Sequence, residues 1–204
     1  ILLAGLDSQM LGRYEFDWIR RALDLLEEND MAGMLCTPTA TPPAWLTSKY
    51  PETVAVNRDG KRFVHGSRRH NCPTSPKYRE LSRRIVEKMA VEFRGHPAAV
   101  AWQIDNEFGC HNQECYCDLC RAGFRKWLEK RYGTLENLNR SWGTRLWSQT
   151  YSRWDEIPLP EATPFLHHPS LRLAFRRYMS DMYAECCHEQ YEVLKAHGHP
   201  KVTT

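Results

Sequence analysis

The sequence has no apolar run that approaches the ~20 residues a membrane-spanning helix needs, so we expect no membrane partner. It has no basic block either. The net charge of +3 comes from dispersed Arg and Lys, and the densest cluster, Arg68-Arg69-His70, is too short to indicate a nucleic-acid surface. Internal repeats, low-complexity tracts and a stretch resembling a signal peptide are also missing. The composition, 42% hydrophobic and 26% charged, is typical of a globular domain.

The ends of the 204-residue sequence resemble cut sites. It begins at Ile1 without Met, and it stops at Thr204 inside the strand-like run Lys201-Val202-Thr203-Thr204. We therefore interpret residues 1–204 as a fragment of one larger domain.

Strands and helices are expected to alternate along the chain. Apolar residues at helical spacing predict helices near residues 16–29 and 76–93, around 124–128 and 135–138, and over 169–197. Short apolar runs predict strands at 34–36 and 99–104. This order is the α/β signature of a parallel sheet. Since a (β/α)8 barrel takes ~250 residues, the chain would hold under half of one.

The segment Asp105-Asn106-Glu107 directly follows the predicted strand 99–104. A carboxyl group at the carboxyl end of a strand is how many sugar-cleaving barrels position a proton donor, and the amide beside it can hold a sugar hydroxyl. An ordinary acidic loop after a core strand is the alternative. We expect Asp105 to act as a structural acceptor that orients its neighbours. Arg68 and Arg69 are read from the residues alone as surface charges that pair with Asp59 or Glu80.

Three of the eight cysteines form a tight run, Cys115, Cys117 and Cys120. Structural zinc takes four such ligands in a tetrahedron, so a fourth must come from elsewhere. We favour Cys72, because a ligand from a separate loop joins two segments of chain. Cys110 and His111 remain alternatives. Four thiolates would close the coordination sphere, which makes the expected Zn2+ structural. Such a cluster, together with long amphipathic helices, favours a reducing compartment and hence a cytoplasmic location over a secreted disulfide scaffold.

Several motifs together resemble the glycoside hydrolase family 42 β-galactosidases. They are Thr37-Pro38-Thr39-Ala40-Thr41-Pro42-Pro43-Ala44-Trp45-Leu46, Gly66-Ser67-Arg68-Arg69-His70-Asn71-Cys72, and Trp102-Gln103-Ile104-Asp105-Asn106-Glu107-Phe108-Gly109-Cys110-His111. The Cys115–Cys120 run, Tyr132-Gly133-Thr134, Trp142-Gly143-Thr144 and Trp147-Ser148-Gln149 also fit. The resemblance covers about Tyr14 to Thr204.

The resemblance implies a partial TIM barrel with long βα loops and retaining hydrolysis of terminal β-D-galactosides. By the family pattern Glu107 corresponds to the general acid/base, while Arg68, Asn106 and Trp147 correspond to substrate-binding residues. Cys72, Cys115, Cys117 and Cys120 match zinc ligands found in many members. A homotrimer is implied for the full-length protein.

Two departures from the family pattern stand out. Residues 1–10 fit the expected second barrel strand poorly, and the second catalytic carboxyl, a Glu on a later strand, would lie beyond Thr204. The isolated chain is therefore expected to be inactive. Two other functions stay open: a zinc-stapled binding or scaffold module in which the Asn-Glu pair is incidental, and a related barrel glycosidase that acts on another β-linked sugar.

Overall fold

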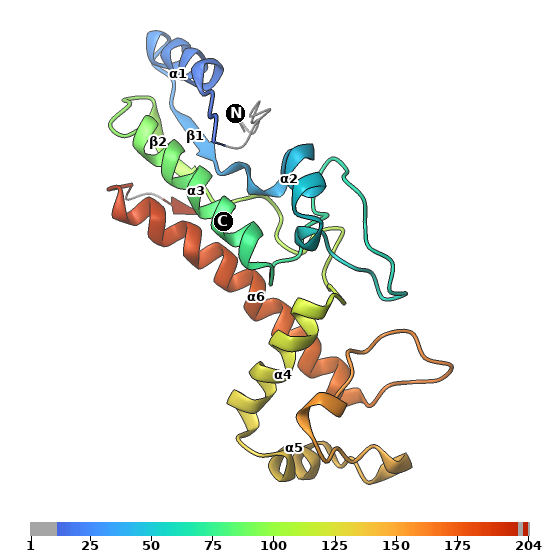
Figure 1. Cartoon of the computed structure of the whole chain (residues 1–204). Coiled ribbons are helices and arrows are strands. Elements are labelled where there is room, and N and C mark those ends of the chain that lie inside the picture. The colour runs from blue at the N-terminus through green and yellow to red at the C-terminus, as the bar shows by residue number, and fades with distance from the viewer. Residues whose placement is uncertain (1–11, 200–201, 204) are drawn as a thin grey trace.

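The computed structural model describes residues 12–199 and 202–203 (Figure 1). Residues 1–10, where the family pattern was expected to fail, lie outside the described part. Three parallel strands form one sheet in the order β1 (Gly33–Cys36), β2 (Ala99–Gln103) and β3 (Val202–Thr203). Leu35 pairs with Trp102, and Trp102 pairs in turn with Val202. The prediction of a parallel α/β sheet is confirmed.

The helices occupy most of the remaining chain. They are α1 (Asp17–Glu28), α2 (Ala44–Lys49), α3 (Pro76–Glu92), α4 (Asp118–Tyr132), α5 (Leu135–Trp142) and α6 (Pro169–Ala196). Short 3-10 turns lie at η1 (Pro38–Ala40), η2 (Pro51–Thr53), η3 (Leu146–Ser148) and η4 (Trp154–Glu156). No helix in the described part of the chain is long and apolar enough to cross a bilayer.

Local sequence accounts for where these helices begin and end. Ser75 precedes α3, and its side chain accepts a hydrogen bond from the Tyr78 backbone N–H, while Pro76 occupies the first turn, where no intrahelical N–H is needed. Thr134 caps α5 in the same way. Gly143 ends α5 in the left-handed conformation, φ 67°, which glycine adopts without a Cβ clash.

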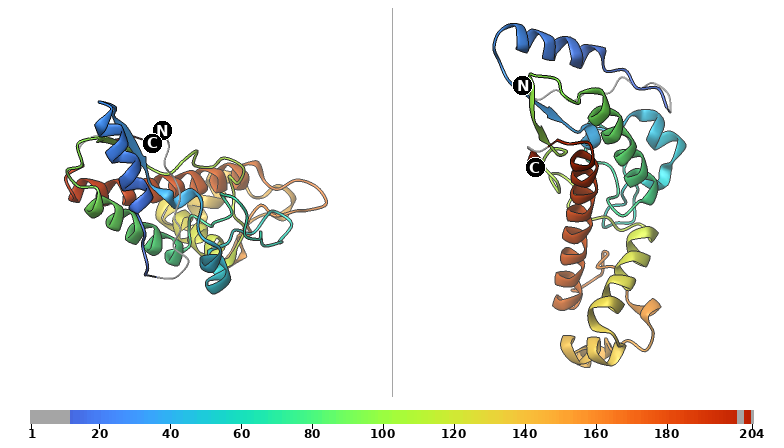
Figure 2. Two further views of the ribbon diagram at one scale, coloured as in Figure 1. Left: turned by 90° about the horizontal axis from the view of Figure 1, so that it is seen from above. Right: turned by 90° about the vertical axis from the view of Figure 1, so that its left-hand side faces the viewer.

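Two hydrophobic cores lie along α6, which extends from the sheet at one end of the molecule to α5 at the other (Figures 1 and 2). The first core is at the sheet and contains Ile19, Leu23, Leu35, Val86, Met89, Phe93, Trp102 and Leu194. The second joins α4, α5 and the N-terminal half of α6, and contains Cys72, Cys115, Cys120, Phe124, Leu128, Leu138, Phe175 and Tyr178. The cysteine run is therefore part of a packed core.

Helices α3 and α6 run side by side near the sheet, as both views in Figure 2 show. Arg79 of α3 contacts both Glu185 and Glu189 of α6, with N–O distances of 3.0 and 2.7 Å. Residues of α3 and α6 pack against the strands in the first core. The two helices thus cover the sheet, and the loops that follow β1 and β2 begin beside them.

Candidate functional site

The candidate site lies where β1 and β2 end. Thr37 follows β1 and Asp105 follows β2 at the same edge of the sheet, because parallel strands place their carboxyl ends together. The backbone N–H of Thr37 donates to the Gln103 carbonyl at 3.0 Å, which continues the ladder one residue beyond β1. The two loops therefore leave the sheet in contact with each other.

The chain turns sharply after β2. Asp105 and Glu107 both have φ of 54°, in the left-handed region that residues with a Cβ avoid. A residue held there costs roughly 1–2 kcal/mol, so surrounding contacts must hold both residues. This turn gives the side chains of 105 and 107 their different directions.

Asp105 is fully buried and makes most of those contacts. Its carboxylate accepts hydrogen bonds from Arg69, from the Thr39 hydroxyl and from the Asn106 backbone N–H. Burial raises the pKa of the Asp105 carboxyl above its ordinary value, and the Arg69 guanidinium opposes that shift. Arg69 also lies over the Phe108 ring, 5.3 Å from its centroid. The expectation that Asp105 orients its neighbours is confirmed.

Glu107 faces outward beside Arg68. Its side chain is 55% exposed, and the Arg68 Nη1 lies 2.8 Å from its Oε2. The Asn106 amide donates to the same Oε2 at 3.3 Å, and the other Arg68 nitrogen, Nη2, lies 3.1 Å from His111 Nε2. The structure thus brings Arg68, Asn106 and Glu107 together.

The expected pairing of the two arginines with Asp59 or Glu80 is wrong. Arg68 pairs with Glu107 and Arg69 pairs with Asp105, whereas Glu80 pairs with Lys77 at 2.6 Å. The physical reason is the parallel sheet: it places the loop after β2 against the loop that carries residues 66–72. Neither side chain is a free surface charge.

Trp147 lies apart from these groups. Its side chain is 70% exposed, its backbone is left-handed at φ 52°, and its ring packs against Phe165 with centroids 5.6 Å apart. It makes no hydrogen bond, ion pair or ring contact with Arg68, Asn106 or Glu107 in the described residues. The segment that follows α5, orange in Figure 1, lies at the end of the molecule away from the sheet.

Cys72, Cys115, Cys117 and Cys120 converge as expected. All four are buried, and their Sγ atoms lie within 4.8 Å of one another. The Sγ of Cys72 is 3.6 Å from that of Cys117 and 3.4 Å from that of Cys120. Tetrahedral coordination with metal–sulfur bonds of ~2.3 Å requires sulfur–sulfur distances of about 3.8 Å. The four thiols could therefore hold one metal ion with little movement.

The surroundings of this cluster also suit metal-bound sulfur. The Val56 backbone N–H donates to the Cys115 Sγ at 3.4 Å, the kind of outer contact that supports a ligand. Hydrogen bonds within the cluster lower the pKa of the Cys117 thiol and raise the pKa of the Cys72 and Cys120 thiols, so the four groups titrate together. Among the described residues, Cys110 and His111 are not part of the four-thiol group, so the choice of Cys72 over these alternatives agrees with the geometry.

One residue at the candidate site, Gln190, was not singled out from the sequence. Gln190 of α6 is buried; its Oε1 accepts from the Thr37 hydroxyl at 2.7 Å and lies 3.2 Å from the Thr39 hydroxyl oxygen. A signal was present: Gln190 is a polar residue on the stripe of α6 that otherwise carries the buried Cys186 and Leu194, four residues to either side. A buried amide on such a stripe requires a polar partner.

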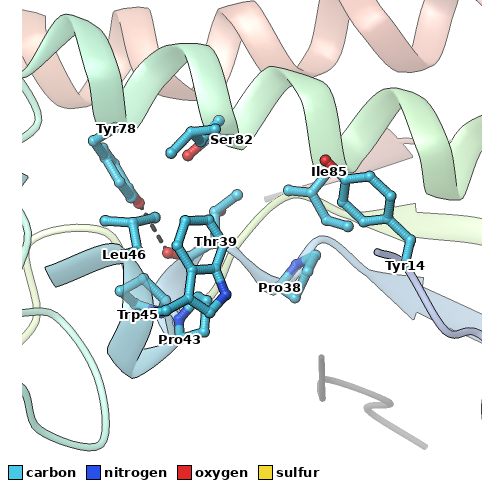
Figure 3. Close-up of a pocket in the computed structure, with 11 residues that line it drawn as sticks. Tyr14, Pro38, Thr39, Pro43, Trp45, Leu46, Tyr78, Ser82 and Ile85 are labelled. Carbon is cyan, nitrogen blue, oxygen red and sulfur yellow. Dashed lines mark hydrogen bonds between the residues drawn. The ribbon is translucent and has the colours of Figure 1, made fainter. Parts of the chain in front are cut away.

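An apolar pocket lies on the other side of the 37–46 segment, against α3 (Figure 3). Tyr14, Pro43, Trp45, Leu46 and Ile85 line it, and the Tyr78 hydroxyl donates to the Thr39 carbonyl at 2.9 Å at its edge. Arg68, Asn106 and Glu107 are not among its lining residues. This pocket is therefore separate from the carboxylate site.

Comparison with known proteins gives a consistent result. The profile of glycoside hydrolase family 42, described as beta-galactosidase, matches residues 10–204. The chain is 45% identical over 184 residues to beta-galactosidase LacZ of Heyndrickxia coagulans, which covers 90% of this chain and 28% of that protein. It is also 45% identical over 194 residues to a beta-galactosidase of Thermus thermophilus, covering 95% of this chain and 30% of the relative.

Solved structures agree. The beta-galactosidase from the psychrophilic Marinomonas ef1 superposes with a TM-score of 0.92 at 39% identity, over 96% of this chain and 30% of that one. The Antarctic haloarchaeal enzyme from Halorubrum lacusprofundi gives 0.90 at 43% identity, over 93% and 28%. The chain thus spans between a quarter and a third of the length of these relatives. It belongs to glycoside hydrolase family 42.

Proposed function

We propose that this chain forms part of a (β/α)8 barrel and that, within a full-length protein, it supplies the general acid/base of a retaining β-galactosidase, Glu107. The observation that carries the proposal is the carboxylate of Glu107 at the carboxyl edge of a parallel sheet, ion-paired to Arg68 and adjacent to Asn106. In barrel enzymes this edge carries the catalytic groups. The family membership of the chain and the names of its relatives support a galactoside substrate.

The proposed chemistry uses Glu107 twice. In the first step its carboxyl protonates the glycosidic oxygen while a second carboxylate attacks the anomeric carbon. In the second step Glu107 takes a proton from the water that hydrolyses the galactosyl-enzyme intermediate. The two carboxyl groups of a retaining enzyme lie about 5–5.5 Å apart. The second one would come from a later strand, outside residues 1–204.

The neighbours of Glu107 are suited to sugar hydroxyls. Arg68 uses one nitrogen on Glu107 and another toward His111, and its guanidinium carries five N–H donors, which leaves donors for a substrate. Asn106 offers both a donor and an acceptor. For Trp147 we propose that its exposed ring contacts the bound sugar. This contact would require parts of the protein beyond the described residues to complete the sugar site.

We further propose that the four-thiol cluster holds a structural zinc ion. Four thiolates fill a tetrahedral sphere and leave no position for water, so the metal supplies stability and no catalytic step. Cys72 lies in the loop before α3, whereas the other three ligands enter α4. The zinc would therefore join these loops, and with them the segment that carries Arg68.

The test of the acid/base role uses Glu107→Gln in the full-length protein, because under this proposal the second carboxyl comes from outside residues 1–204. Loss of general acid catalysis should lower kcat for lactose by about 10²–10⁴-fold. A nitrophenyl galactoside has a leaving group that needs less protonation. The rate of its first step should therefore fall much less than that of lactose. Added azide should then yield galactosyl azide, since azide needs no general base.

Glu87→Gln is the matched control, because Glu87 is exposed on the outer helix α3; it should leave both substrates unaffected. Unchanged turnover of lactose by Glu107→Gln would remove Glu107 from the mechanism. Absence of any galactosidase activity in the folded parent protein would favour a zinc-stapled scaffold, and preference for another glycoside would favour a related glycosidase.

A further inference from the structure

The turn that presents Glu107 is tied to α6 by a chain of buried hydrogen bonds. The Thr37 hydroxyl accepts from the Asp105 backbone N–H at 2.7 Å, and it donates to Gln190 Oε1, also at 2.7 Å. A hydroxyl has one proton, so both its donor and its acceptor functions are used in this chain. Thr37, Asp105 and Gln190 are each at most 2% exposed.

A second hydroxyl strengthens the same connection. Thr39 donates to the Asp105 carboxylate at 2.5 Å, and its oxygen lies 3.2 Å from Gln190 Oε1. The Gln190 amide nitrogen donates to the Cys186 carbonyl at 3.4 Å within α6, which sets its oxygen toward the two threonines. Asp105 is therefore held through its backbone and through its side chain.

This restraint acts on a residue with a left-handed backbone. Asp105 has φ of 54°, and its N–H donates to the Thr37 hydroxyl. Two residues further on, Glu107 adopts the same unusual φ. If the N–H of Asp105 lost its acceptor, a buried donor would be left unpaired at a cost in free energy. A change in the conformation of the turn that gave this N–H another partner would then be favoured.

We propose that Thr37 and Gln190 are positioning residues that hold the Asp105–Glu107 turn and thereby aim the Glu107 carboxyl at the leaving-group oxygen. Neither side chain touches Glu107; both act through Asp105. The inference rests on the proposed acid/base role of Glu107. It adds a residue of α6, 83 positions away from Glu107 in sequence, to the groups that determine how well the proton is delivered.

The decisive variant is Thr37→Val in the full-length enzyme, since valine keeps the shape and removes the hydroxyl. The readout is the ratio of kcat/KM for nitrophenyl galactoside to kcat/KM for lactose, because kcat/KM reports the first step, in which Glu107 acts as the acid. A misaimed acid harms the substrate that needs protonation, so this ratio should rise about tenfold or more; displacements of about 1 Å can cost 10²-fold. Thr37→Ser, which restores the hydroxyl, should return the ratio to that of the parent.

Thr53→Val is the matched control. Thr53 is equally buried, and its hydroxyl donates to the Tyr50 carbonyl at 2.7 Å, within its own turn. It should leave the ratio unchanged even if it lowers thermal stability. If Thr37→Val does not fold, Gln190→Met decides the question on the same ratio, because it removes the acceptor of the Thr37 proton and leaves Thr37 in place.

The outcomes separate this inference from the function on which it rests. A raised ratio in Glu107→Gln and in Thr37→Val supports both. A raised ratio in Glu107→Gln with an unchanged ratio in folded Thr37→Val or Gln190→Met overturns the positioning role alone. An equal loss on both substrates in Thr37→Val also overturns it, because that is the result of a merely structural residue. An unchanged ratio in Glu107→Gln overturns the acid/base role itself.

Discussion

At the scale of single residues, Arg68 and Arg69 are neighbours in sequence but work in different environments. Arg68 is partly exposed and contacts the outward-facing Glu107, whereas Arg69 is buried against Asp105. Arg69 has φ of 65°, which turns its side chain inward. A buried ion pair adds little net stability compared with apolar residues of the same shape, but removal of one partner leaves an unpaired charge.

Arg69→Met should therefore destabilise the full-length protein by about 3 kcal/mol, measured by urea unfolding followed through tryptophan fluorescence. Adding Asp105→Asn removes the stranded charge, so the double variant should be more stable than Arg69→Met alone. Arg83→Met is the control: Arg83 contacts Glu189 on the exposed side of α3, and its loss should change little. A double variant less stable than Arg69→Met would contradict a dominant charge effect.

The partners of these arginines could not be predicted from the sequence. Arg69 and Asp105 are 36 residues apart, and only the parallel sheet brings their loops together. The left-handed backbone at Asp105, Glu107 and Trp147 gave no signal either, because none of these residues is glycine. The Asp-Asn-Glu segment itself was predictable, since it directly follows an apolar strand.

At the scale of elements, α6 organises the molecule, and α4 crosses it closely. A Cβ at Gly123 of α4 would lie 2.3 Å from the Tyr178 hydroxyl oxygen of α6 and 3.2 Å from its Cζ. Tyr178 is buried and hydrogen-bonded to Thr74 at 3.0 Å, so its ring has little freedom to move. Glycine at 123 thus sets the distance between the two helices.

Gly123→Ala should destabilise the protein by about 1–3 kcal/mol through this clash, although alanine is the better helix former by about 1 kcal/mol. Combining it with Tyr178→Phe removes the oxygen that is struck first and should reduce the cost. Gly66→Ala, where a Cβ meets open space, should leave the unfolding midpoint almost unchanged. Full tolerance of Gly123→Ala would mean that α4 and α6 are not tightly packed here.

All the helices except α2 (Ala44–Lys49) were predicted from the spacing of their apolar residues. Pro76, Gly143 and Gly198 lie at or near the boundaries where their backbone preferences place them. The 3-10 turns and the irregular segment 143–168 were not resolved by such patterns, because they depend on contacts with distant residues. The hydrogen bond from Arg125 Nε to the Ile157 carbonyl, at 3.1 Å, is one such contact.

At the scale of the whole molecule, the four-thiol cluster brings together two segments that are far apart in sequence. Cys72 belongs to the loop that leads into α3, while Cys115, Cys117 and Cys120 precede or begin α4. The cluster lies in the core shared by α4 and α6. The run of Cys115, Cys117 and Cys120 indicated metal ligation through its spacing, whereas Cys72 was chosen because a ligand from a separate loop joins two segments of chain.

Metal analysis of the purified full-length protein should find about one zinc per chain. Cys117→Ser should lose the metal and lower the melting temperature, because structural zinc contributes directly to folding free energy. Cys110→Ser is the matched control and should retain the metal, since Cys110 is outside the cluster. A metal-free parent with normal stability would refute the zinc assignment.

Only two residues, His70 and Asn71, separate Arg69 from Cys72. Each extended residue spans roughly 3.3–3.6 Å. A stretch of two residues is therefore too short to change in length without moving either Arg69 or Cys72. We expect that a one-residue deletion between positions 69 and 72 would move Arg68 into the inward position three residues before Cys72, sending the wrong guanidinium to the buried aspartate. Natural variation in loop length should therefore be confined to the segment before Arg68.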